Sequence, residues 1–364
     1  MEELTVEVLR AWARTALVEL GRARTGIDEL NVYPVPDGDT GTNLYLTWEA
    51  ACDALPKGEL TFTEAIQAFG RGALLGARGN SGVITSQLIR ACGLRLDENL
   101  PRAGERDADG VLVDPRMSEA AAFADALRYA ADAAYGAVAQ PVEGTMLTVA
   151  RAAAAGAMTA ANDGKSLADV CLAAVASARQ ALTKTTEQLD VLRRAGVVDA
   201  GGAGLVVILG AMESVLTGQY VRVDVPARVE PQGEDAVSED GPAYEVMYLL
   251  DAPDDKIGDF RQGLAALGDS VVVVGGDGLW NVHVHTDDVG AAIEHGIDIG
   301  RPHRIRVTHF ADQSHHHEPA PGRAVIAVVA GDGLGDLFTE AGARIIRGGP
   351  GRRCSTGELL QAIE

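Results

Sequence analysis

Apolar residues recur at helical spacing along residues 1–218, and runs that alternate apolar with polar residues are few. The stripe that begins with Leu4 and Val8 predicts an amphipathic first helix, which we expect to end at Gly21 and Gly26. Ala-rich stretches with the same periodicity follow it. The pattern predicts an all-α domain over residues 1–218.

The second half of the chain mixes strand-like and helical segments. We interpret residues 219–243 and 313–322 as linkers, because proline and polar residues replace the periodic pattern there. Residues 244–312 are predicted to form an α+β domain with the β-α-β-β-α-β order of a ferredoxin-like sandwich. Its predicted elements span 244–250, 255–267, 270–275, 279–286, 289–299 and 304–310. Residues 323–364 begin like a buried strand but are too few to close a sheet, so we interpret them as the start of an incomplete α/β domain, either in a fragment or as an appendage.

Two carboxylates lie close together in the stretch NVYPVPDGDTGTN at residues 31–43. Asp37 and Asp39 are two positions apart in a loop stiffened by prolines, so both can turn toward one point. Such a pair suits Mg²⁺, which binds one or two carboxylates together with substrate phosphates. A helical pattern follows and places Thr40 or Thr42 near a helix N-terminus, where free N–H groups bind phosphate. The loop therefore predicts a metal and nucleotide site.

Other sites with paired Asp residues fit this loop less well. An EF-hand calcium loop would need Gly where Thr42 stands and Glu where Trp48 stands. An Asp nucleophile would follow a buried strand, which Tyr-Pro-Val-Pro cannot form. A solvated Asp-Gly turn without chemistry stays open on this loop alone.

Three further turns of small residues lead into predicted helices, at residues 77–82, 143–145 and 199–204. If neighbouring helices run up and down around one axis, these helix starts gather at one end with the Asp37 loop. Their backbone N–H groups would then point at a polyanion. One such start is ordinary capping, but four beside an Asp pair favour a phosphate site.

Charge and composition exclude several functions. The net charge of −21 and the pI near 4.7 argue against nucleic-acid binding, because a phosphate backbone needs a basic surface. No apolar run reaches the length of a membrane span and no signal-peptide pattern opens the chain, so we expect a cytoplasmic protein that is not integral to a membrane. The four cysteines lack C-x-x-C spacing and are expected to be reduced.

His283 and His285 are two positions apart on a predicted strand and therefore on one face, which is the arrangement of a metal-binding pair. No third ligand stands nearby in the sequence. A structural or surface role is therefore favoured for them. The His tract at residues 315–317 is interpreted as part of the linker.

Four motifs, in this order, carry a resemblance to a known family: the stretch at 31–43, GARGNSGVI at 76–84, PVEGTMLT at 141–148 and GVVDAGG at 196–202. VHVHTD at 282–287 and VVAGDGL at 328–334 extend it over nearly the whole chain. Together they resemble the kinase subunit of bacterial fatty-acid kinase, whose N-terminal domain is similar to the ATP-binding L domain of dihydroxyacetone kinases. Most of that family's C-terminal domain would be missing here.

The resemblance implies an eight-helix barrel that uses ATP and Mg²⁺ to phosphorylate the carboxylate of a fatty acid, which a separate fatty-acid-binding protein presents. By motif match, Asp37 and Asp39 are implied to be the Mg²⁺ ligands and the catalytic pair. Asn31 stands near a third ligand position of the dihydroxyacetone kinases. The residues implied to bind the nucleotide are Thr40, Gly41, Thr42, Asn43, Asn80, Ser81, Gly82, Thr145, Met146 and Asp199.

The middle domain departs from the family pattern. Members with zinc there pair the two histidines with a Cys in a Tyr-Cys-Thr-Glu segment, and this chain has Ala243 at the Cys position. We therefore predict that His283 and His285 are one ligand short of a zinc site and that the domain folds without zinc.

Two other functions stay open, namely a dihydroxyacetone-type small-molecule kinase and a non-catalytic nucleotide-binding regulatory subunit. The middle domain argues against the first, because the triose kinases lack it. The paired Asp residues argue against the second. A homodimer also stays open.

Overall fold

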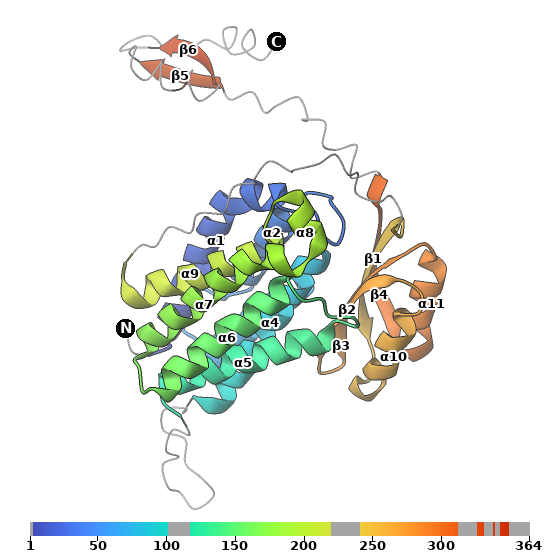
Figure 1. The fold of residues 1–364 in the computed structure, drawn as a ribbon, viewed down its shortest axis with the longest axis horizontal. Helices are drawn as coiled ribbons and strands as arrows, with labels where there is room; N and C mark the ends of the chain where they lie inside the picture. Colours follow the sequence, from blue (N-terminus) through green and yellow to red (C-terminus); the bar gives the residue numbers. More distant parts are fainter. Residues whose placement is uncertain are drawn as a thin grey trace, which may run out of the picture. The chain divides into compact units, whose positions relative to one another are not determined.

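A computed structural model of the chain describes residues 3–100, 117–219, 241–311, 326–330, 338 and 343–348 (Figure 1). Internal contacts divide the chain into two units, Met1–Phe310 and Ala311–Glu364. The first unit holds a helical region followed by a small sheet with two helices. The second holds a pair of short strands.

The helical region is built from α1 (Val6–Glu29), α2 (Thr40–Asp53), α3 (Phe62–Gly76), α4 (Gly79–Asn99), α5 (Glu119–Ala137), α6 (Met146–Asn162), α7 (Leu167–Gln188), the short α8 (Asp190–Ala195) and α9 (Ala200–Thr217). From α1 to α7 each helix packs against the next. Helix α9 packs against both α7 and α1, so the order of packing returns to its start (Figure 1). Consecutive packed helices alternate in direction, which brings every second helix start to the same end.

Small and aromatic side chains fill the core of this region. Alanines on α5, α6 and α7 are buried, and their size lets these helices approach closely. Trp12, Trp48 and Phe69 form an aromatic cluster from three helices, with ring centroids 5.0–6.1 Å apart. Each indole N–H donates to a backbone carbonyl, at 2.9 Å in both cases. The polar atoms of these rings are therefore satisfied inside the core.

Helix α9 is long and apolar enough to resemble a membrane span, but 78% of that stretch is buried inside the structure. It is apolar on nearly every side because α1, α2, α6 and α7 surround it. Its composition is that of a core helix.

The first helix is longer than its sequence indicated. Helix α1 continues through Gly21 and Gly26 to Glu29, so the prediction that these glycines end it is wrong. Ile27 and Leu30 extend the buried stripe beyond both glycines. A Cβ at Gly21 would lie 3.3 Å from the Tyr45 ring, so the missing side chain lets α2 pack closely. This packing outweighs the roughly 1 kcal/mol by which Gly disfavours a helix.

The sheet region follows the predicted order of strands and helices. It contains β1 (Tyr244–Asp251), a single 3₁₀ turn (Asp254–Lys256), α10 (Ile257–Leu264), β2 (Asp269–Gly276), β3 (Leu279–Thr286), α11 (Val289–Ile299) and β4 (Arg301–His309). The strands lie in the order β2-β3-β1-β4, and all neighbouring pairs are antiparallel.

Both faces of this sheet are covered. One face, which includes Val246, Val282 and Val284, packs with α10 and α11 in a core of its own. On the other face, Met247 and Val272 pack against residues of α3, α4 and α5. Residues directly opposite on antiparallel strands share a face, so the register Met247↔His283 and Glu245↔His285 turns both histidines toward the helical region.

Polar contacts hold the sheet on the helices. The Asn281 amide donates to Leu74 O at 3.0 Å, and Ala139 N donates to Val271 O at 3.0 Å. The Arg90 guanidinium on α4 donates to Gly275 O near the end of β2. These bonds position one edge of the sheet over the starts of the helices.

In the second unit, β5 (Ile326–Ala330) and β6 (Arg344–Gly348) form a parallel pair. Strand β5 coincides with the predicted strand at the start of the C-terminal segment. The predicted linkers lie largely or wholly outside the described residues. The domain boundaries drawn from the sequence stay predictions.

Candidate functional site

One cavity of about 310 Å³ lies where four helix starts meet the sheet. The starts are those of α2, α4, α6 and α9, which are the four small-residue turns singled out in the sequence. Sequence-predicted site residues in its lining are Asn31, Asp37, Asp39, Thr40, Asn43, Asn80, Ser81, Thr145, Met146 and Asp199. The fold therefore brings together residues that stand up to 168 positions apart in the chain.

Gly41, Thr42 and Gly82 do not belong to this lining. The Thr42 hydroxyl donates to Asp28 at 2.9 Å, which ties α2 to the end of α1. A Cβ on Gly41 or Gly82 would lie 2.3 Å from a neighbouring atom, on α1 and α2 respectively. The structure thus places these three residues where helices pack closely.

Three of the four helix starts at the cavity differ in their capping from the starts at the other end of the helices. At the remote end, α1, α3, α5 and α7 each have an N-cap Ser or Thr whose oxygen accepts from a backbone N–H, namely Thr5, Thr61, Ser118 and Ser166. At the cavity, the N-cap residues of α2, α4 and α6 make no such bond. Backbone donors in a first helical turn have no partner within the helix. Asp28 accepts from Gly41 N and Thr42 N of α2, and Asp199 accepts from Met146 N of α6. An anionic ligand would suit the remaining donors and would be favoured by the helix dipoles.

Asn31 orders the loop that carries the Asp pair. Its amide nitrogen donates to Asp37 Oδ1 at 2.5 Å and to Val35 O at 2.9 Å. Its oxygen accepts a hydrogen bond from the Thr40 hydroxyl. Asn31 thus positions Asp37 against the start of α2, while its role as a metal ligand stays a prediction.

Burial and neighbouring carboxylates raise the pKa of Asp37 to about 8, with Asp39 and Glu245 supplying the charges. Holding these acids together without a cation is therefore unfavourable. A divalent cation between Asp37 and Asp39 would offset the repulsion, and their oxygen atoms are the ligands that Mg²⁺ prefers. The donor set therefore fits a Mg²⁺ ion.

Asp199 joins two of the helix starts. It is the N-cap residue of α9, where it accepts from Gly202 N at 2.6 Å. It also accepts from the backbone N–H of Met146, the first residue of α6. Burial raises its pKa to about 6 despite these two bonds.

The sheet forms the wall of the cavity that faces the helix starts. Glu245, Asp269, Ser270 and His285 all line it. Burial and the charge of Asp39 raise the pKa of Glu245 to about 7. Glu245, Asp269 and Ser270 carry no recognisable motif, and only the folding of β1 and β2 against the helices brings them here.

The lining of the larger cavity is strongly acidic. It includes five carboxylates, Asp37, Asp39, Asp199, Glu245 and Asp269, and neither Lys nor Arg is among the described lining residues. A polyphosphate would meet strong repulsion from these groups alone. Metal cations would have to accompany it.

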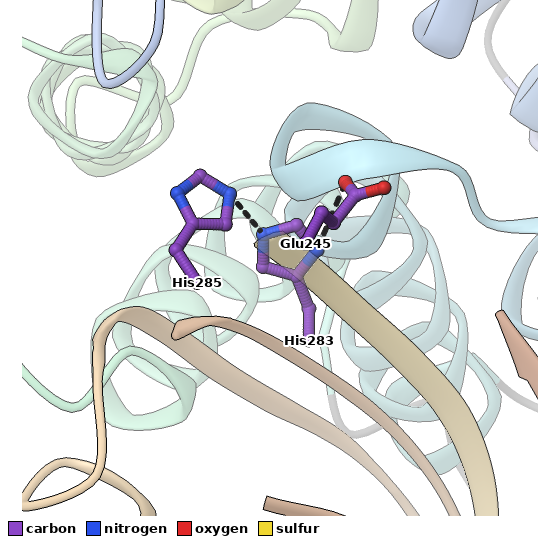
Figure 2. A group of neighbouring side chains, drawn as sticks. All are labelled: Glu245, His283 and His285. Carbon is purple, nitrogen blue, oxygen red and sulfur yellow. Dashed lines mark hydrogen bonds and ion pairs between the residues drawn. The ribbon is translucent and has the colours of Figure 1, made fainter. Parts of the chain in front are cut away.

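His283 and His285 lie on the wall side of β3, with Glu245 beside them on β1 (Figure 2). The expectation that the pair lacks a third ligand is wrong, because one ligand atom from each of the three lies within 4.8 Å of the other two. Sequence spacing hid this, since Glu245 is far away in the chain but directly opposite His285 in the sheet. Burial lowers the pKa of His285 to about 4 and that of His283 well below 6.5, so both rings are neutral.

A second cavity, of about 90 Å³, lies inside the helical core. Its lining is almost entirely apolar, with residues such as Leu9, Trp12, Ile89 and Met212. Its lining contains no carboxylate or histidine. The charged and polar candidate residues line the larger cavity.

Both the helical region and the sheet region match families of known proteins. Residues 34–214 match the family model described as the DAK2 domain, and residues 241–317 match the model of the FakA-like fatty acid kinase middle domain. An uncharacterized protein of Staphylococcus haemolyticus is 33% identical over 93% of this chain and 64% of its own length. Protein YloV of Bacillus subtilis is 32% identical over 95% of this chain and 65% of its own length. The chain thus spans just under two thirds of the length of these relatives.

Proposed function

Because the chain belongs to the family of DAK2-domain proteins with a FakA-like fatty acid kinase middle domain, we propose that it is an ATP-dependent fatty-acid kinase. The reaction would transfer the γ-phosphoryl group of ATP to the carboxylate of a fatty acid presented by a separate fatty-acid-binding protein. The products would be an acyl phosphate and ADP.

One observation carries this proposal. The N-cap residues of α2, α4 and α6 make no side-chain capping bond, and these helix starts converge on one cavity beside Asp37 and Asp39. Backbone donors at helix starts suit phosphate oxygens, and paired carboxylates suit the Mg²⁺ that accompanies them. Phosphoryl transfer needs little beyond such positioning and charge neutralisation.

The chain's own residues would then have distinct roles. Asp37 and Asp39 would hold Mg²⁺, which neutralises phosphate charge when bound. Asn31 keeps Asp37 oriented through the 2.5 Å hydrogen bond. An oxygen of the acceptor carboxylate forms the new bond to the γ-phosphorus while the bond to the β,γ-bridging oxygen breaks. The acceptor is already ionised at neutral pH, so no residue has to remove a proton.

The acyl chain would stay in the partner protein. The lining of the larger cavity includes five carboxylates, which do not suit the burial of an acyl chain. Exposing the chain to water costs roughly 0.8 kcal/mol per CH₂, which favours a carrier that keeps it covered. Only the carboxylate would have to reach the cavity.

The proposal also includes the detailed fold of the two regions and the location of the protein in the cell. The closed order of helix packing supports an eight-helix barrel, and the strand order β2-β3-β1-β4 supports a ferredoxin-like middle domain. A cytoplasmic location agrees with an apolar helix that is mostly buried in the core.

Two assays test the function. Calorimetric titration of ATP into the full chain should show binding with Mg²⁺ and little binding without it. Acyl phosphate should then form from oleate loaded on a fatty-acid-binding protein. Efficient phosphorylation of free oleate would overturn the two-component reaction, and turnover of dihydroxyacetone would favour the small-molecule kinase. ATP binding without turnover of either substrate would favour the regulatory role.

A further inference from the structure

The acceptor of the proposed reaction would bring a negative charge into a cavity that is already acidic. Five carboxylates line this cavity, and neither Lys nor Arg is among its described lining residues. A Mg²⁺ ion at Asp37 and Asp39 would be shared with the phosphate oxygens of the nucleotide. A carboxylate that approaches the γ-phosphate therefore needs a cation of its own, since like charges repel more strongly in a buried site than in water.

Arg306 lies on β4, next to the part of the sheet that forms the wall of this cavity. Strand β4 is the outermost strand of the sheet, and its Thr308 lies opposite Glu245 of β1. Arg306, two positions earlier, lies opposite Met247. Residues that pair directly share a face, so Arg306 and Glu245 are diagonal neighbours on the face that turns toward the helical region. Because Glu245 lines the cavity, the long side chain of Arg306 begins beside it.

The charge of Arg306 acts on the cavity wall without a close partner of its own. Burial and the charge of Asp39 raise the pKa of Glu245 to about 7, and the charge of Arg306 offsets part of that rise. Arg306 is exposed, and its guanidinium has no hydrogen-bond or ion-pair partner among the residues that the structure describes. Its N–H groups are therefore available to an anion that arrives from outside.

We propose that Arg306 binds the carboxylate of the fatty-acid acceptor and holds it beside the cavity wall. This role rests on the proposed kinase function and adds to it a residue that recognises the acceptor. A guanidinium presents a planar fork of donors that fits a carboxylate, and it stays charged at neutral pH. One carboxylate oxygen would accept from Arg306, while the other forms the new bond to the γ-phosphorus.

The position of Arg306 on an outermost strand suits an acceptor that arrives on another protein. Within the described residues no strand pairs with the outer side of β4, so a fatty-acid-binding protein could approach Arg306 without displacing part of the fold. Charged side chains also protect the open edge of a sheet from unwanted pairing. Arg301 is equally exposed but lies opposite Asp251, at the other end of β4. Edge protection alone would give both arginines the same behaviour.

Steady-state kinetics of the full chain, with oleate loaded on a fatty-acid-binding protein, test this role. R306Q should lower kcat/KM for the loaded protein roughly 10- to 100-fold, which is the effect of losing a hydrogen bond to a charged group. R306K should recover part of the loss, because it keeps the charge but not the fork. R301Q removes the same charge from the same strand and should behave like the unmodified chain. The KM for ATP should stay unchanged in all three variants.

Binding measurements in Mg²⁺ and ADP, which allow no transfer, separate the carboxylate from the protein that carries it. The unmodified chain should bind the fatty-acid-binding protein more tightly when that protein holds oleate than when it holds oleyl alcohol. R306Q should remove this difference. Equal weakening with both ligands would overturn the proposal, because Arg306 would then contact the carrying protein itself.

The kinetic results also distinguish this role from the function on which it rests. An unmodified chain that forms no acyl phosphate would overturn the proposed function and this role with it. In an active chain, R306Q with unchanged constants, or with a raised KM for ATP alone, would overturn only the role of Arg306.

Discussion

The side-chain amide of Asn31 donates to Asp37 Oδ1 at 2.5 Å. This bond joins the end of the first helix to the loop that carries Asp37 and Asp39, so the direction of the Asp37 carboxylate depends on a residue six positions earlier.

Replacing Asn31 with Ala should lower phosphoryl transfer roughly 10- to 100-fold, because positioning partners of metal ligands have effects of that size. Asn99 offers a matched control, since its amide donates to Asp125 Oδ2 at 2.9 Å in a buried pair away from the cavity. N31A and N99A should both lower the melting temperature. Only N31A should lower the turnover rate with saturating Mg²⁺ and ATP, and equal activities would contradict this role for Asn31.

Replacing Asp37 with Asn should abolish phosphoryl transfer and raise stability when no metal is present. The pKa of Asp37 in the folded chain is about 8, above its ordinary value of 3.8, so folding at neutral pH has to take up a proton that the unfolded chain has lost. A neutral side chain removes that cost. We therefore expect the melting temperature of D37N without metal to rise by at least roughly 2–4 °C, which corresponds to about 1 kcal/mol in a domain of this size.

The measurement for D37N is thermal unfolding in a chelator, paired with acyl-phosphate formation in Mg²⁺. D39N should also lose activity. A D37N protein that melts below the unmodified chain in chelator, or that turns over at a comparable rate, contradicts the assignment.

Asp199 should make the protein less stable as pH rises from about 4 to about 6. Its folded pKa of about 6 exceeds the ordinary value of 3.8, so the folded state binds the proton more tightly. In this window the unfolded state binds fewer protons, and the free energy of unfolding therefore falls as pH rises. The loss from this group is complete above its folded pKa and should be about 3 kcal/mol.

Urea unfolding of the unmodified chain and of D199N between pH 4 and 7 checks this dependence. The Asn oxygen can still accept from the Gly202 N–H, so the cap of α9 remains. D199N should show a shallower fall in unfolding free energy across the window. Parallel curves for the two proteins would refute the prediction.

Replacing Arg90 with Ala should loosen the wall of the cavity. Its guanidinium donates to Gly275 O and pairs with Asp277 Oδ2 at 3.3 Å, which attaches the β2–β3 turn to α4. We expect a several-fold higher KM for ATP with little change in the melting of the helical region. D277N keeps the bond to Gly275 and removes only an exposed ion pair, so it should behave like the unmodified chain. An R90A protein with an unchanged KM would show that this contact does not position the wall.

The helical period was readable over residues 1–218 because each helix buries one apolar stripe, and stripes are local features of the sequence. The four small-residue turns were readable for the same reason, since caps and glycine-rich starts depend on neighbouring residues. The end of α1 was not, because close packing of Tyr45 beside Gly21 overrides a local preference. Local propensity is weaker than tertiary packing at such a position.

For the candidate site too, some residues could be identified from the sequence and others only from the tertiary structure. The sequence by itself identified Asp37, Asp39 and the helix starts that line the cavity, because their motifs are contiguous. It could not show that the N-cap residues of α2, α4 and α6 make no side-chain capping bond, or that the starts of these helices converge on one cavity. Only the tertiary structure placed Glu245 opposite His285 and turned both toward Asp39, since strand register and the packing of the sheet on the helices join residues with no local pattern between them.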